Sequence, residues 1–155
     1  MTNMNTHIFD DLLAFWFNPN NEHYWFQATS LDDKFIADKF SNLLSSFLDD
    51  KEKKINYPHP ITHKHSPKLL IGSIIYFDQI MRHIARSKNE DYMAQYGEIS
   101  LQYSEYILNI NPFLIGYSNK EICFILLPLR HTKMLAANTN FSSNNFFQEI
   151  YKSLI

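Results

Sequence analysis

The sequence has a single cysteine, Cys123, among its 155 residues. A lone cysteine excludes a disulfide within the chain and a cluster of thiolate metal ligands. Cys123 lies in an apolar run, which favours a core thiol over a nucleophile, because apolar surroundings raise a thiol pKa. Glycine is also scarce, with three residues, which argues against glycine-rich phosphate loops and against sheet-rich folds with many tight turns.

The chain also lacks a strong charge of one sign and any long apolar run. Its formal net charge is −2, so no electrostatic argument favours nucleic acid or an anionic membrane as a partner. No apolar run reaches the length of about 18 residues that suggests a membrane span. The polar N-terminus has no signal-peptide pattern. We therefore expect a cytoplasmic protein in a reducing compartment, with neither nucleic-acid nor membrane partners.

Common catalytic and cofactor signatures are absent as well. The sequence has no Walker loop, no dinucleotide-binding fingerprint and no HExxH zinc helix. Three histidines, His59, His63 and His65, cluster in one segment and could bind a metal. No acid or cysteine lies near them, so a solvated loop is the favoured interpretation. The sequence thus predicts no metal and no cofactor.

What the sequence does contain is typical of one helical domain. Hydrophobic residues make up 45% and charged residues 19% of the chain, an ordinary globular balance for a single domain over residues 1–155. Aromatic residues reach 15%, which predicts a bulky core. Apolar periodicity and capping residues predict an all-α fold of about six helices in antiparallel pairs, with no convincing strand pair. These helices are expected near residues 8–17, 29–48, 66–86, 91–109, 118–128 and 142–154.

We expect the other helices to pack around the helix over residues 66–86. Ser66 suits the N-cap, and Pro67 suits the first helical position, where its missing N–H costs nothing. Apolar residues then recur every three or four positions, and the first half is apolar on almost every side, so we expect a buried helix. The members of this repeat are Leu70, Ile74, Phe77, Met81 and Ile84.

The last two turns of this helix change from apolar to polar. Asp78, Arg82 and Arg86 are spaced by four residues and share a stripe, with Gln79 beside them. The acid precedes the base, which is the favourable order for an ion pair on a helix. Charges on the flank of a buried helix are costly unless they are paired. The stripe therefore marks either a set of internal ion pairs or one wall of a site.

Four short segments carry a family resemblance. Residues 75–86 resemble the "LLDQFPRNIFRG" motif of the domain of unknown function 924 family, and residues 126–132 resemble its "LPFMHSE" segment. Residues 13–17 and 24–26 resemble its opening "DFWF…WF" motifs, and all four agree in order and spacing over roughly residues 8–135. The resemblance implies an all-helical, tetratricopeptide-like fold of the kind found in bacterial members, with no established activity.

The chain also departs from the family pattern. Met81-Arg82-His83 stands where the family has Pro-Arg-Asn. Thr132-Lys133-Met134 follows His131 where the family has Ser-Glu-Asp, so two acids are lost and a base is gained. The sequence stops at Ile155 without the second basic, "GRFPHRN"-like motif that the family carries. A family site that needs these groups would be altered or incomplete here.

The predicted site joins the polar stripe to the segment beyond Pro128. Arg82 offers a planar fork of donors for a carboxylate or phosphate, and His131 could donate to an anion or carry a proton. Alternatively, Asp78 and Arg82 form only an intrahelical pair, His131 only caps backbone groups, and the aromatics are core. The candidate ligand-binding residues are Trp16, Trp25, Asp78, Gln79, Arg82, Arg86, Arg130 and His131.

Three functions follow from this site and fold. The first is a helical domain that binds a small molecule, with an anionic ligand as its partner. The second is a protein-interaction scaffold of tetratricopeptide-like type, with a protein partner. The third is a hydrolase or transferase that acts on a phosphorylated or acyl substrate, with His131 as the catalytic proton carrier. The sequence sets neither the ligand's identity nor the oligomeric state.

Overall fold

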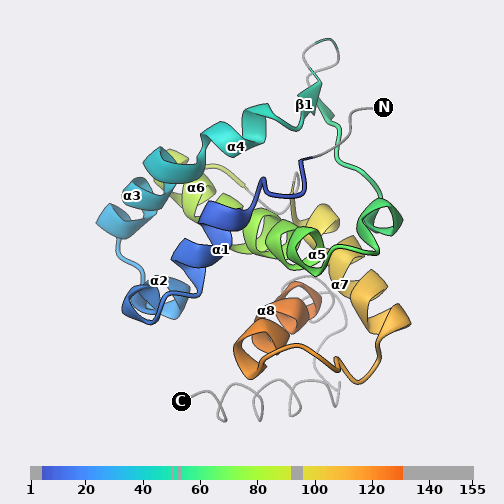
Figure 1. Ribbon diagram of the computed structural model, residues 1–155. Coiled ribbons are helices and arrows are strands. Elements are labelled where there is room, and N and C mark those ends of the chain that lie inside the picture. The colour runs from blue at the N-terminus through green and yellow to red at the C-terminus, as the bar shows by residue number, and fades with distance from the viewer. Residues whose placement is uncertain (1–4, 50, 52–53, 92–95, 131–155) are drawn as a thin grey trace.

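The structure is a computed structural model that describes residues 5–49, 51, 54–91 and 96–130. It confirms the all-α class (Figure 1). In the described residues, the helices are α1 (Asp10–Trp16), α2 (His23–Phe26), α3 (Ser30–Phe40), α4 (Asn42–Ser45), α5 (Pro67–Ile74), α6 (Met81–Lys88), α7 (Glu98–Ile110) and α8 (Asn119–Leu129). Shorter elements are the 3-10 turns η1 (Pro19–Asn21) and η2 (Pro60–His63), the π-helical segment η3 (Ile75–Ile80) and the strands β1 (Leu48–Asp49) and β2 (Lys54–Ile55).

The predicted central helix is present, and it runs without a break through α5, η3 and α6. Ser66 caps it as expected, since its hydroxyl accepts a hydrogen bond from the Leu69 amide at 3.3 Å. The helix lies in the middle of the fold, where α5 contacts α1, α7 and α8 and α6 contacts α3 (Figure 1). It ends at Asn89, which adopts the left-handed conformation with φ 56°. The other described helices thus pack around this single one.

The middle of the central helix is π-helical over η3, which the sequence did not predict. A π-segment widens the turn by one residue and is frequent at functional sites. Asp78 and Gln79 both lie in η3, and Arg82 follows in the first turn of α6. The wider turn therefore sets the spacing between the acid and the base of the predicted stripe.

Two capping boxes confirm the predicted starts of the helices that flank the site. The Thr29 hydroxyl accepts from the Asp32 amide while the Asp32 carboxylate accepts from the Thr29 amide, which fixes the start of α3. Ser118 and Glu121 make the same pair at the start of α8. Pro128 was expected to kink or end this helix, but it lies inside α8, which continues through Leu129.

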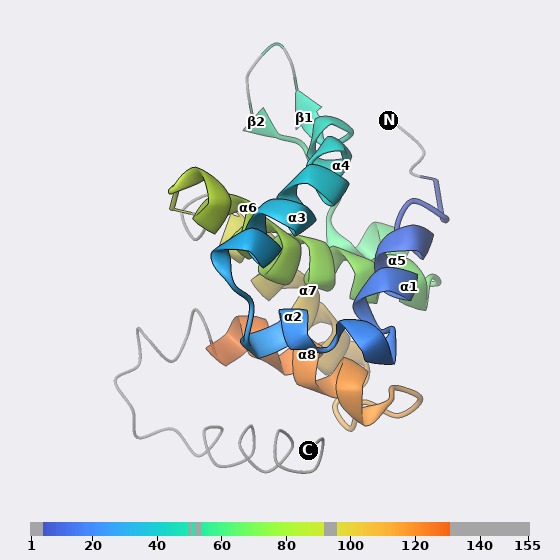
Figure 2. The same ribbon diagram turned by 90° about the vertical axis from the view of Figure 1, so that its left-hand side faces the viewer.

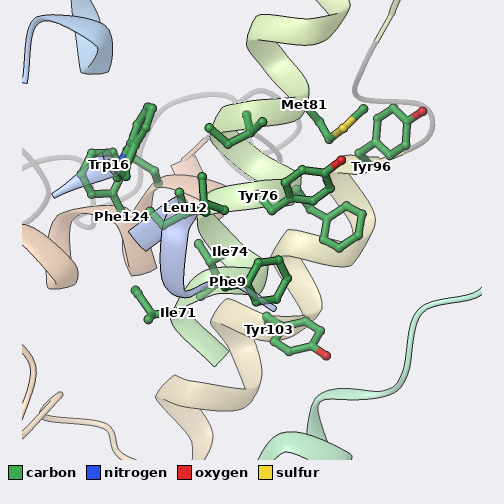
Figure 3. Close-up of a cluster of buried hydrophobic side chains, with 14 of the residues drawn as sticks. Phe9, Leu12, Trp16, Ile71, Ile74, Tyr76, Met81, Tyr96, Tyr103 and Phe124 are labelled. Atoms are coloured by element: carbon green, nitrogen blue, oxygen red, sulfur yellow. The ribbon is translucent and has the colours of Figure 1, made fainter. Parts of the chain in front are cut away.

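Large aromatic side chains fill the core between α1, the central helix and α8 (Figure 3). Trp16 is fully buried and meets Phe124 of α8 edge-on, with 5.6 Å between ring centroids. At the other end of α1, Phe9 packs directly on Gly72 of α5, where a Cβ atom would lie 2.6 Å from the Phe9 ring. Glycine is thus required at position 72 for α1 to approach the central helix this closely.

The sequence analysis was wrong about three local features. Leu48 pairs with Ile55 in an antiparallel strand pair, although no pair was expected. The second predicted helix ends at Phe40, and a separate helix, α4, follows, so the expected continuous helix to residue 48 is broken. The helix predicted over residues 91–109 does not include Asp91, which lies outside any helix, and α7 begins at Glu98.

The helix predicted over residues 142–154 lies outside the described residues. Within the part of the chain that is described, no helix has both the length and the hydropathy needed to cross a bilayer.

Candidate functional site

An ion-paired cluster joins α3 to α6 beside the predicted stripe. The Asp33 carboxylate lies 2.6 Å from His83 Nδ1, and it accepts hydrogen bonds from Arg86 Nε at 3.1 Å and Arg86 Nη2 at 3.0 Å. Asp33 and His83 are buried, whereas the Arg86 side chain is 47% exposed. Because Asp33 is a carboxylate acceptor at this short distance, His83 must carry its proton on Nδ1 and donate it. The cluster thus holds the guanidinium of Arg86 in one orientation.

The charge states of this cluster follow from its partners. Burial would raise the pKa of Asp33, but the hydrogen bonds and charges of Arg86 and His83 outweigh burial and hold it below its usual value. Burial lowers the pKa of His83, and the nearby Arg86 charge adds to this, against the opposing effect of Asp33. At neutral pH, Asp33 is therefore ionised and His83 is neutral.

Asp78, Gln79 and Arg82 form a second polar group on the same helix. Gln79 Nε2 donates to Asp78 Oδ2 at 2.7 Å, and both side chains are buried. Arg82 Nη2 lies 3.9 Å from Asp78 Oδ1, which is longer than a hydrogen bond, and the Arg82 side chain is 28% exposed. The predicted intrahelical pair therefore exists as a loose charge contact, while the stronger bond of Asp78 goes to Gln79.

A pocket of about 380 Å³ lies where these two groups face α2 and α8. Figure 2 shows α2 beside α8, with α3 and α6 next to them. The charged and polar side of the pocket comes from α3 and the central helix, and its apolar side comes from α2 and α8. The residues that line it are Trp25, Phe26, Ala28, Asp33, Gln79, Arg82, Arg86 and Leu127.

Four of the predicted site residues, Trp25, Gln79, Arg82 and Arg86, line this pocket together. Trp25 is held by a hydrogen bond of 3.0 Å from its Nε1 to the Trp16 carbonyl.

The other four predicted residues are placed differently. Trp16 is fully buried in the core, so the alternative interpretation of this aromatic as a packing residue applies. Asp78 is buried behind the pocket and lies against Arg82 rather than in the lining. Arg130 is exposed just after the end of α8 and does not line the pocket. His131 lies outside the described residues.

The sequence analysis missed Asp33, and it noted His83 without assigning it to the site. Asp33 lies in the first turn of α3, where an acid is favourable for the helix dipole without any tertiary partner. A signal was nevertheless present, since His83 lies three residues before Arg86 in the polar part of the predicted helix. The positions of His83 and Arg86 in the sequence do not show, however, that their common partner Asp33 lies on another helix, 50 residues before His83.

Other hollows and reactive side chains of the described residues lie apart from this pocket. A larger hollow of about 480 Å³ lies between α1 and the α3–α4 region, but it contains none of the predicted site residues. Cys123 is buried, and burial raises its pKa to about 11. Among the described residues, no group of three histidine, cysteine, aspartate or glutamate side chains is placed to hold a metal ion. His63 is buried rather than solvated as expected, and burial lowers its pKa.

Comparison with known proteins gives one match. No curated protein and no solved structure matches the chain. The profile of a single family, described as "Bacterial protein of unknown function (DUF924)", matches residues 12–152. The match covers the central helix, the capped helices α3 and α8 and every residue that lines the pocket. By this match across most of its length, the chain belongs to the DUF924 family of bacterial proteins of unknown function.

Proposed function

We propose that this protein binds a small molecule with an anionic group in the pocket between α6, α2 and α8. The observation that carries the proposal is the placement of Arg82 and Arg86, one helical turn apart, in the lining of one pocket with Gln79 and Trp25. Small-molecule sites combine an apolar wall with a few convergent polar groups, and this lining has both.

The two arginines have different parts in this proposal. Asp33 holds Arg86 through two hydrogen bonds, so Arg86 supplies a fixed positive charge. Arg82 also lines the pocket, and its side chain is 28% exposed. A guanidinium can bind a carboxylate or phosphate through two parallel hydrogen bonds. Arg82 is therefore the proposed anion-binding residue, and Trp25 the proposed contact for the body of the ligand.

The test is a screen of small carboxylates and phosphates for an increase in melting temperature of the full chain. Compounds that raise it are then titrated into the protein, and binding is followed by tryptophan fluorescence. The signal should come from Trp25, which lines the pocket, since Trp16 is buried in the core. Arg82→Gln should weaken binding by about tenfold or more, the value of one charge-assisted hydrogen bond. Lys64→Gln removes a surface charge at the opposite end of the central helix and should leave binding unchanged.

A hit that binds Arg82→Gln and the unchanged chain equally would refute this site. A screen without any hit would refute the proposed function as a whole. Arg130→Gln, in the same assay, tests whether the predicted contribution of Arg130 exists beside that of the residues that line the pocket.

Four further predictions from the sequence remain part of this proposal. They are a single domain over residues 1–155, a tetratricopeptide-like arrangement of the helices, a cytoplasmic location and a protein partner. The alternative of a hydrolase or transferase depends on His131. An activity that survives His131→Ala would exclude that residue as the proton carrier.

A further inference from the structure

We propose that the ligand of this pocket is a monoanion: a single carboxylate, with a hydrogen-bond donor next to it, on a flat apolar body. This inference rests on the proposed function, because it names the class of ligand for the same pocket. It excludes polyphosphates, such as nucleoside triphosphates, which are the other obvious anions for a pair of arginines.

The balance of charge around the pocket supports a single negative charge. Arg82 and Arg86 line it, but Asp33 also lines it and is bonded to Arg86, and Asp78 lies behind Arg82. These two positive and two negative charges sum to zero, so the described residues around the pocket hold no surplus of positive charge for a ligand with several negative charges. Arg130, three residues after Leu127, would add at most one further positive charge. Each additional charge on a ligand would be taken out of water without a partner, which is costly.

Gln79 supports a donor beside the carboxylate. Its amide nitrogen faces Asp78 at 2.7 Å, and this assignment is forced, since a carboxylate only accepts hydrogen bonds. One N–H of this nitrogen goes to Asp78, so Gln79 keeps its second N–H and its carbonyl oxygen, an acceptor, for a ligand in the pocket. An acceptor near Arg82 can stabilise an N–H or O–H of the ligand that lies next to the bound carboxylate.

The apolar side of the pocket supports a flat body. Trp25, Phe26 and Leu127 provide it, and the Phe26 side chain is 46% exposed. The Phe26 ring stacks on Phe124 at an interplanar angle of 4°, and the Trp25 ring meets Phe124 edge-on at 4.9 Å. The volume of about 380 Å³ lies at the small end of the range for ligand pockets, roughly 300–1,000 Å³. A ligand with one ring system and one carboxylate has this size and shape.

The experiment compares monocarboxylates with polyanions on the full chain, by calorimetric titration and melting temperature. N-acetylphenylalanine has the carboxylate, the adjacent N–H and the ring, and its primary amide is the matched neutral control. ATP and inorganic tripolyphosphate are the polyanions, and further aromatic monocarboxylates extend the first set. We expect the tightest binder to be a monocarboxylate, its amide to bind about tenfold more weakly or worse, and both polyanions to bind more weakly than the carboxylate.

Arg82→Lys tests whether the planar pair of donors, rather than the positive charge alone, binds the ligand. Lysine keeps the positive charge but lacks the planar pair of donors, so the exchange should weaken binding of the carboxylate by more than it weakens binding of either polyanion. A polyanion that binds as tightly as the best monocarboxylate, with binding lost in Arg82→Gln, would overturn this inference and leave the proposed function standing. Absence of any binding, in this set and in the wider screen, would overturn both.

Discussion

Replacing Asp33 by asparagine tests the cluster that holds the site together. The exchange keeps the shape of the side chain but removes the charge that accepts from His83 at 2.6 Å and from Arg86 at 3.0 and 3.1 Å. The Arg86 side chain is 47% exposed, so water replaces much of what it loses. The His83 side chain is 2% exposed, so its Nδ1–H depends on the single oxygen that asparagine keeps rather than on water.

The expected cost comes from exchanging a carboxylate for an amide with only one oxygen. The amide oxygen can accept on one side, but the NH2 group then faces another donor of the cluster, so one donor loses its acceptor. A donor that loses its partner in a buried cluster costs about 1–3 kcal/mol, and the screened Arg86 pair adds up to about 1 kcal/mol. We therefore expect Asp33→Asn to lower the free energy of unfolding by about 1–4 kcal/mol. For a domain of this size that is a fall of roughly 2–16 °C in melting temperature.

The assay is urea unfolding followed by circular dichroism, with thermal unfolding beside it. Asp38→Asn is the matched control, because Asp38 lies on the same helix and is exposed, so its exchange should change stability by less than about 0.5 kcal/mol. Equal effects of the two exchanges, or a loss below about 1 kcal/mol for Asp33→Asn, would refute the assignment of Asp33 as the anchor of α3 on α6.

Three further outcomes are expected. The pKa of His83 is lowered from 6.5 in the folded chain, so the unfolded chain binds the proton first. The free energy of unfolding should therefore be highest above about pH 6.5 and should fall as the pH drops below this value. His83→Gln should flatten this part of the curve of stability against pH. An unchanged curve would show that His83 does not titrate in this way. Gly72→Ala places a Cβ 2.6 Å from the Phe9 ring, and crowding of about 1–3 kcal/mol should exceed the roughly 1 kcal/mol gain in helix propensity. Denaturant unfolding measures this change, and Phe9→Leu should partly restore stability if the clash is the cause. Ser118→Ala should cost about 1 kcal/mol in the same measurement, because it removes one half of the capping box of α8, and no loss would mean that the box does not determine where α8 starts.

Local signals in the sequence predicted the frame of this fold. Ser66, Thr29 and Ser118 each marked a helix start, and in each case the hydroxyl accepts from the backbone amide three residues later. These signals work because the cap and its partner lie within one turn, so no knowledge of the tertiary fold is needed. The same reasoning failed for the π-segment η3, since the apolar repeat fits an α-helix through residues 75–80 and no single residue there demands the wider turn.

The polar stripe of the central helix shows what helical spacing can and cannot predict. Spacing by four predicted a charge pair between Asp78 and Arg82 along one helix, and their side chains lie 3.9 Å apart. Arg86 instead binds Asp33, which is 53 residues away in sequence. Helical spacing specifies neighbours within a helix but cannot specify which acid another helix will present.

The Asp33 cluster also helps to position the elements that line the pocket. Asp33 of α3 binds Arg86 of α6, and Trp16 and Trp25 join α1, α2 and α8 through Phe124. These contacts hold the elements that carry Asp33, Gln79, Arg82 and Trp25, which line the pocket. Loss of binding in Arg82→Gln at unchanged stability, set against loss of stability in Asp33→Asn, would separate the residue that binds from the residue that holds the pocket open.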